Sequence, residues 1–261
     1  MDIKILVATH KKYRMPNDQA YIPMHVGREE KESIGYMGDN IGDNISLKNP
    51  NYCELTAMYW AWKNLKCDYV GLVHYRRYFS KKPLIYRLFN DKFNCILSSD
   101  EIKKLLSDND IILPKKRNYF VETLYSHYAH THYAEHLEIT REIILELYPE
   151  YVDSFDLTMQ KRSAHMFNMF IMKKSLSDEY CEWLFDILAL LEKRIDINAY
   201  DAFQARLYGR VSELLLNVWI EERKLEYKEI PHIHMERINW FDKGLKFLQA
   251  KFNSRKLDRS F

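Results

Sequence analysis

The sequence has little cysteine, which limits how the chain can be cross-linked or bind metal. Its 261 residues include four cysteines, Cys53, Cys67, Cys95 and Cys181, and no two of them form a C-x-x-C pair. This spacing fits neither a zinc-binding pattern nor a compact disulfide framework. We therefore expect reduced thiols, as in cytosolic proteins.

Glycine, proline and net charge are also scarce. Seven Gly and seven Pro exclude long flexible linkers, and 39 Lys plus Arg nearly balance 37 Asp plus Glu, for a formal charge of +2. This balance argues against a nucleic-acid-binding protein and against an acidic disordered chain. No apolar run approaches the roughly 18 residues of a membrane span. The N-terminus lacks the long apolar core and cleavage site of a signal peptide. We therefore expect a cytoplasmic protein.

Apolar runs alternate with amphipathic segments along most of the chain. We expect strands at 3–8, 68–75, 110–113, 165–172 and 225–231, and an extended piece at 21–27. We expect helices at 52–65, 100–107, 121–147, 177–193 and 199–223, and a long loop at 35–51. This alternation predicts an α/β fold with a mixed, mostly parallel sheet flanked by helices, formed by residues 1–236.

Polar and cationic side chains follow the expected strands. Ligands of open α/β sheets bind beyond the carboxyl ends of the strands. The residues there are Thr9, His10 and Lys11, then His74, Tyr75, Arg76 and Arg77, then Lys115, Lys116 and Arg117. Arginine matches phosphate oxygens with two parallel hydrogen bonds, so these clusters favour a phosphate site. A solvated basic edge is the alternative for any single cluster.

Several long motifs keep their order over residues 3–79. They are ILVATHK, P-x-x-x-x-YIP-x-x-VG, GDNIS-x-KNP-x-YCELTA and DYVGLVHYRRYF. The series resembles a family of bacterial capsular and exopolysaccharide glycosyltransferases long known as a domain of unknown function. Some members of that family are β-1,3-galactofuranosyltransferases. The resemblance continues more weakly to about residue 234.

The resemblance implies a GT-A-like, Rossmann-type domain that binds a nucleotide-sugar. The implied reaction moves a hexose, galactose or galactofuranose, from a UDP-sugar to a glycan or a polyprenyl-diphosphate-linked acceptor during surface polysaccharide synthesis. We expect the transfer to invert the anomeric centre. The expected donor site comprises Thr9, His10, Lys11, Tyr21, Val26, Gly27, Asp43, Asn44, Asn49, His74, Tyr75, Arg76 and Arg77. For Asp43 and Asn44, an ordinary turn is the alternative.

Many GT-A enzymes carry a D-x-D metal motif at the strand end that here reads HYRRYF. This chain has His74 and two arginines there. We favour a metal-independent arginine clamp. The alternative is a divalent ion, Mn²⁺ or Mg²⁺, bound by His74, by His234 and by a carboxylate from elsewhere in the chain.

The second half of the chain is expected to supply the acceptor site and the base that deprotonates the acceptor hydroxyl. The acceptor candidates are His132, His136, Asn168 and Arg210. Residues 206, 210 and 213 share one helical face, which makes Glu213 the first candidate for the base and Asp201 the second.

Two alternatives to a glycosyltransferase stay open. The missing D-x-D would also fit a non-catalytic module that binds a nucleotide or a carbohydrate. The sequence HYAEH at 132–136 matches an inverted zinc-protease motif, with both histidines on one face of a helix.

The end of the chain, 237–261, is basic and amphipathic. Residues 238–261 contain six basic and two acidic side chains, and Phe241, Leu245, Leu248 and Phe252 fall on one helical stripe. Such a helix is typical of a peripheral anchor on an anionic membrane, here the inner face of the plasma membrane. A last helix packed on the domain is the alternative.

Overall fold

A computed structural model describes residues 1–236, and the expected basic tail at 237–261 lies outside the described residues. The central sheet has the strand order β10-β6-β9-β4-β1-β2-β3, and β5 and β11 extend it from the end of β4. Its strands are β1 (Ile3–Thr9), β2 (Tyr21–His25), β3 (Met37–Gly38), β4 (Tyr69–His74), β5 (Arg77–Phe79), β6 (Ile111–Pro114), β9 (Phe170–Lys173), β10 (Lys228–Ile230) and β11 (His232–His234). A separate ribbon pairs β7 (Arg117–Asn118) with β8 (Ser163–Ala164).

The strand directions confirm the predicted mixed, mostly parallel α/β sheet. β1 is parallel to β2 and β4, β2 is parallel to β3, and β10 is parallel to β6. β9 is antiparallel to both of its neighbours, β4 and β6, which therefore run in the same direction as each other. The carboxyl ends of β1, β2, β4 and β6 consequently meet at one edge, where the chain also enters β9.

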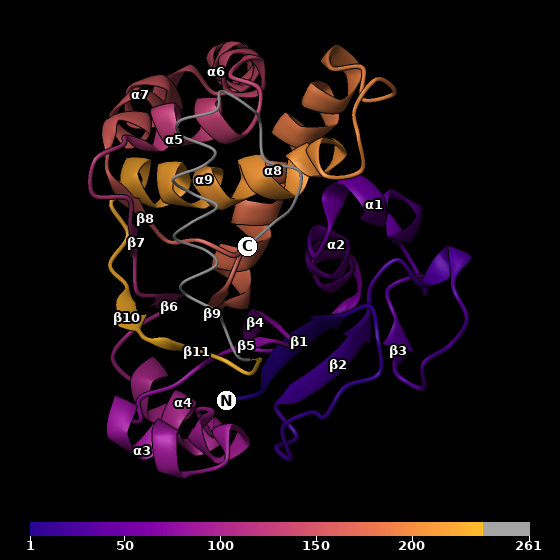
Figure 1. Ribbon diagram of the computed structural model, residues 1–261, viewed down its shortest axis with the longest axis vertical. Coiled ribbons are helices and arrows are strands. Elements are labelled where there is room, and N and C mark those ends of the chain that lie inside the picture. The colour runs from indigo at the N-terminus through magenta and orange to yellow at the C-terminus, as the bar shows by residue number, and fades with distance from the viewer. Residues whose placement is uncertain (237–261) are drawn as a thin grey trace.

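Helices cover both faces of the sheet (Figure 1). The α-helices are α1 (Asn49–Tyr52), α2 (Leu55–Asn64), α3 (Leu84–Phe89), α4 (Ser99–Leu106), α5 (Leu124–Thr131), α6 (Glu135–Leu147), α7 (Val152–Gln160), α8 (Lys174–Arg194) and α9 (Leu207–Glu222). Short 3-10 turns include η1 (Arg28–Glu30), η2 (Ser46–Lys48), η3 (Lys92–Cys95), η4 (Pro149–Tyr151) and η5 (Gln204–Arg206). α3 and α4 lie apart from the bundle of α5 to α9 (Figure 1).

The sheet has a hydrophobic core on each of its faces, because successive side chains along a strand point to opposite faces. In β1, Leu6 and Ala8 pack under the larger helical layer, whereas Ile5 and Val7 pack on the opposite face with α4 and β11. Because both faces are covered, the central strands are continuous apolar runs, as buried parallel strands require.

Three expected elements are interrupted at the edge where the strands end. The helix expected at 52–65 is two helices, because Cys53 takes φ 56° between α1 and α2. The helix expected at 121–147 is also two, because α5 ends at Thr131 and the backbone of His132 is extended. In the strand expected at 165–172, Phe167 and Asn168 have φ of 76° and 51°, so β9 starts only at Phe170.

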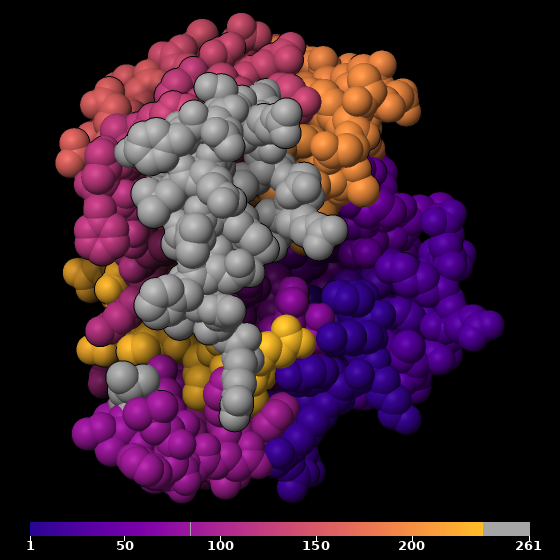
Figure 2. Space-filling model, viewed as in Figure 1, coloured from indigo at the N-terminus to yellow at the C-terminus, as the bar shows by residue number. Residues whose placement is uncertain are grey.

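Segments that are far apart in the sequence, around residues 48–51 and 192–205, lie side by side. Asn51 in α1 donates from Nδ2 to the carbonyl oxygen of Ala205 at 3.0 Å, and Lys48 pairs with Glu192 at 2.6 Å. Figure 2 shows the orange surface of this later segment against the purple surface of the first. Within residues 1–236, no helix combines the length and the apolarity needed to cross a bilayer.

Candidate active site

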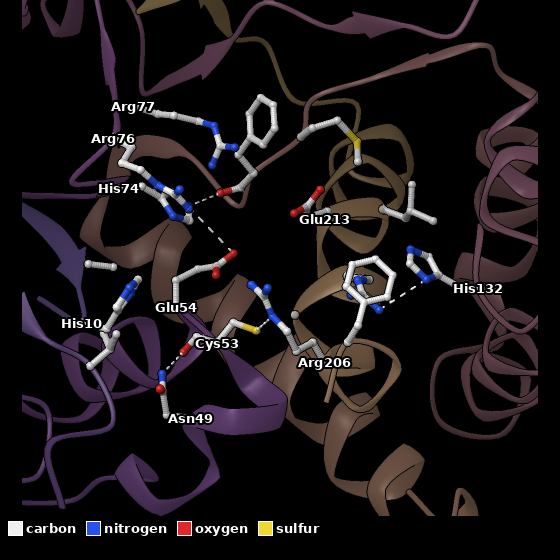
Figure 3. Close-up of a pocket in the computed structure, with 18 of the residues that line it drawn as sticks. His10, Asn49, Cys53, Glu54, His74, Arg76, Arg77, His132, Arg206 and Glu213 are labelled. Carbon is white, nitrogen blue, oxygen red and sulfur yellow. Dashed lines mark hydrogen bonds and ion pairs between the residues drawn. The ribbon is translucent and has the colours of Figure 1, made fainter. Parts of the chain in front are cut away.

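A cavity of about 610 Å³ opens at the carboxyl ends of β1 and β4. Its walls come from the ends of β1, β2 and β4, from α1 and the start of α2, from the β7 segment and α5, and from η5 and α9 (Figure 3). The position agrees with the general rule for ligand sites in open α/β sheets.

The cavity is strongly cationic. Six Lys and Arg side chains line it, whereas its acidic lining residues are Glu54 and Glu213. The six are Lys31, Arg76, Arg77, Arg117, Arg206 and Arg210. Within residues 1–236, Arg77, Arg117 and Arg210 form no ion pair with a carboxylate. Cations gathered in a partly buried site without carboxylate partners favour an anionic ligand.

The break at Cys53 brings Glu54 to the cavity. The Nδ2 of Asn49 donates to the Cys53 carbonyl at 2.7 Å and holds the left-handed turn. Gly209 of α9 packs against this turn, where an added Cβ would lie 3.1 Å from the Cys53 Cβ. Glycine at 209 therefore permits the close approach that sets Glu54 opposite α9.

Glu54 is fixed by a residue from the segment that precedes β9. Asn168 donates from Nδ2 to Glu54 Oε1 at 2.7 Å and to the Gly209 carbonyl at 3.0 Å. Its Oδ1 accepts from the Ser212 hydroxyl at 3.0 Å. Asn168, expected as an acceptor-binding residue, is 3% exposed and does not line the cavity; its side chain instead positions Glu54, which does.

The backbone of Phe167 connects β4 to α9. His74 donates from Nε2 to the Phe167 carbonyl at 2.7 Å, which fixes its tautomer, and burial lowers the pKa of His74. The Phe167 amide forms a hydrogen bond with Glu213. Glu54 Oε1 lies 3.9 Å from the same His74 nitrogen. His74 is thus linked to Glu54 and to the Phe167 carbonyl, and Glu213 lies near this group in the cavity (Figure 3).

Glu213 has the protonation behaviour of a general base. Burial, followed by the nearby charge of Glu54, raises its pKa to about 7, against the opposing Phe167 hydrogen bond and Arg77. A carboxyl group with a pKa near neutrality suits proton abstraction from a hydroxyl at neutral pH.

The far end of the cavity lies across from the strand ends, with His10 on one side and His132 on the other (Figure 3). His132 contacts Gln204 Oε1 through Nδ1 at 3.0 Å, and Arg210 Nη1 lies 3.3 Å from the same nitrogen. Burial, and then Arg210, lowers the pKa of His132 to about 3, so its ring is neutral.

The structure brings many of the expected site residues into this one cavity. Those that line it are Thr9, His10, Val26, Asn49, His74, Tyr75, Arg76, Arg77, His132, Arg210 and Glu213. Gly27 lies beside the cavity, because a Cβ at this position would contact Asn49, which lines it. Lys11 is next to His10 but its ammonium pairs with Glu236 at 3.5 Å.

Other expected site residues lie elsewhere. Tyr21 is buried on the opposite face of the sheet and donates to the Leu97 carbonyl at 2.7 Å. Asp43 and Asn44 hold their own loop: the Asp43 side chain accepts from Tyr59, and Asn44 donates to Gly42. Asp201 caps the turn before η5 by accepting from the amides of Phe203 and Gln204. None of these four residues lines the cavity.

The zinc-protease geometry expected for HYAEH is wrong, because His132 and His136 do not share a helix. His136 is fully buried in α6, with Nδ1 against the Tyr128 hydroxyl at 3.0 Å and Nε2 against the Tyr200 hydroxyl at 3.2 Å. It also lies outside the cavity lining.

Of the two histidines expected for a divalent ion, His74 lines the cavity and His234 does not. His74 Nε2 is bound to a carbonyl, and His234 Nε2 lies 3.1 Å from His232 Nε2, outside the cavity lining. Among residues 1–236, no three His, Cys, Asp or Glu side chains gather as a ligand set. The positive charge of the cavity is carried by guanidinium and ammonium groups.

Sequence reasoning overlooked Glu54, Tyr119 and Phe203, all of which line the cavity. Glu54 lies within the YCELTA motif, which is the sequence feature that could have identified it as a site residue. Nothing local marks Tyr119 or Phe203, whose placement depends on β7 and η5.

Comparisons with known proteins agree with this architecture. No curated protein matches the chain. Among solved structures it is similar to the apo structure of WbbM, a bifunctional glycosyltransferase, with a TM-score of 0.82 and 33% sequence identity. The similarity covers 91% of this chain and 46% of that one, so the chain spans about half the length of WbbM. Residues 4–224 match the family described as Domain of unknown function (DUF4422). The resemblance expected from the motifs is therefore confirmed, and the chain belongs to this family.

Proposed function

We propose that this protein is a glycosyltransferase that moves a hexose from a UDP-sugar to a glycan or lipid-linked acceptor. The observation that carries the proposal is a cationic cavity at the strand ends that contains a carboxyl group with a pKa near 7. The similarity to a bifunctional glycosyltransferase supports it. Galactose or galactofuranose as the sugar, and a role in capsular or surface polysaccharide synthesis, extend the proposal through the resemblance.

The donor diphosphate is assigned to the end of the cavity near β1 and β4. His10 and Arg76 lie there, and Arg77 follows β4 directly. Burial, and then Arg76, lowers the pKa of His10, so its neutral ring adds hydrogen bonds rather than charge. The guanidinium groups neutralise the negative charge that develops on the diphosphate as the bond from the sugar breaks.

Glu213 is assigned as the base. Its carboxylate takes the proton of the acceptor hydroxyl while that oxygen forms a bond to the anomeric carbon and UDP departs with the electron pair of the broken bond. One displacement of this kind inverts the anomeric centre. Glu54, held by Asn168, is placed to orient sugar hydroxyls between the donor and Glu213.

The test is release of UDP from a panel of UDP-sugars with simple alkyl glycosides as acceptors, in Mn²⁺ and in EDTA. We expect acceptor-dependent UDP release that is equal in both buffers, because arginine supplies the charge. Binding of UDP without any transfer would favour the non-catalytic module instead.

We place the protein in the cytoplasm, with 237–261 as a peripheral membrane contact, and liposome flotation with and without 240–261 tests that placement.

A further inference from the structure

The proposed function leaves the far end of the cavity without a ligand. The diphosphate is assigned near His10 and Arg76, and Figure 3 places His132 across the cavity from His10. Arg210 belongs to the His132 end, because its Nη1 lies 3.3 Å from His132 Nδ1. A second cation, Arg210, is therefore present at the end of the cavity away from His10.

Arg210 is a half-buried cation whose hydrogen-bonding capacity is only partly used. Its Nη1 lies 3.3 Å from His132 Nδ1, within hydrogen-bond distance. Its Nη2 is buried and has no hydrogen-bond partner, and no carboxylate of residues 1–236 forms an ion pair with Arg210.

The guanidinium is nevertheless held in place. It stacks on the ring of Phe203 at 4.0 Å, and Tyr128 packs edge-on against His132 at 4.9 Å. Stacking on an aromatic ring limits the rotation of the guanidinium plane, and Arg210 lines the cavity. A guanidinium held beside aromatic rings matches an anion that presents paired oxygens and is carried on a sugar or a chain.

We propose that this end of the cavity, the Arg210 subsite (Tyr128, His132, Phe203 and Arg210), binds an anionic group of the acceptor. The group is a carboxylate of an acidic sugar or a phosphate of a lipid diphosphate, since both present paired oxygens to the guanidinium. The inference rests on the proposed function and specifies in addition that the acceptor carries a negative charge.

The test measures acceptor binding to the full chain saturated with UDP. The probes are octyl β-D-galactoside, octyl β-D-galacturonide and octyl diphosphate, titrated by calorimetry. We expect at least one anionic probe to bind about tenfold or more tightly than the neutral galactoside, the usual size of a charge-assisted hydrogen bond. Preference for the galacturonide identifies an acidic sugar, and preference for the diphosphate identifies a lipid-linked acceptor.

Variants assign the preference to Arg210. Arg210→Gln should reduce it to less than about twofold, and Arg210→Lys, which keeps the charge but not the fork, should leave an intermediate value. Arg223→Gln, an exposed position after α9 paired with Glu179, is the matched control and should keep the full preference. Equal binding of all three probes to the wild type, or an undiminished preference in both Arg210 variants, overturns the proposal. Failure to bind UDP at all instead counts against the proposed function.

Discussion

Asn168 and Glu54 are 114 residues apart in the sequence and are joined by a 2.7 Å hydrogen bond. Asn168 also bonds to Gly209 and Ser212, so its amide group is fully used inside the protein. Its left-handed backbone, φ 51°, turns the chain into β9. One residue therefore ties the start of α2, the entry to β9 and the first turn of α9 together beneath the cavity.

We expect Asn168→Gly to lower the free energy of unfolding by about 1–3 kcal/mol, because buried groups lose their partners while glycine still accepts the left-handed backbone. Asn168→Ala should cost roughly 1 kcal/mol more, since it adds a Cβ in that conformation. Urea denaturation measures both. The control is Asn198→Gly at an exposed loop position, which should change stability little. Wild-type stability in Asn168→Gly would contradict the assigned role.

Glu213→Gln should reduce sugar transfer by at least about 100-fold, the usual contribution of a general base. The amide cannot take the acceptor proton, while UDP binding should persist because the phosphate contacts are made by other residues. Coupled UDP-release kinetics and calorimetry with UDP measure the two effects. Asp201→Asn is the control, because Asp201 is an exposed capping residue, and it should stay active. A fully active Glu213→Gln enzyme would remove Glu213 from the mechanism.

The pH profile should report the ionisation of Glu213. Its pKa is about 7 and only the carboxylate acts as base, so kcat/KM should fall about tenfold per pH unit below that value. Glu54 contributes to the raised pKa through like-charge repulsion. Removing that charge with Glu54→Gln favours the ionised form of Glu213, and the acidic limb should move to lower pH. The position of the limb is the readout, whatever the residual rate, and an unmoved limb would refute this coupling.

The sequence predicts the parts of the fold that depend on local pattern. The strands expected at 3–8 and 68–75 are β1 and β4 within one residue at each end, because continuous apolar runs between polar residues indicate buried strands. The location of the cationic residues after these strands is also predicted, because the strand ends determine it. His10, Arg76 and Arg77 were therefore found without a structure.

The interruptions depend on tertiary contacts, and the sequence does not predict them. No glycine or proline marks Cys53, whose left-handed turn is stabilised by Asn49 and by the close approach of Gly209. Glu54 falls within the helix expected at 52–65, and its place in the cavity is not predicted. The α5–α6 break at His132 has no local signal either. Asn168 was different, because asparagine tolerates left-handed backbone and could have indicated a turn.

Arg77 offers the sharpest test of the phosphate assignment. Its Nε is buried without a hydrogen-bond partner, its guanidinium stacks on Phe167 at 4.3 Å, and burial lowers its pKa. A desolvated cation of this kind gains most from an anion. Arg77→Gln should therefore weaken UDP binding by about tenfold or more while leaving uridine binding within about twofold.

Calorimetry with UDP and with uridine measures the two affinities side by side. The matched control is Arg14→Gln, because Arg14 is exposed, pairs with Asp91 at 2.6 Å and does not line the cavity. Its UDP affinity should equal that of the wild type. If Arg77→Gln weakened uridine and UDP equally, Arg77 would support the nucleoside site as a whole, and the phosphate clamp would have to come from other arginines of the cavity.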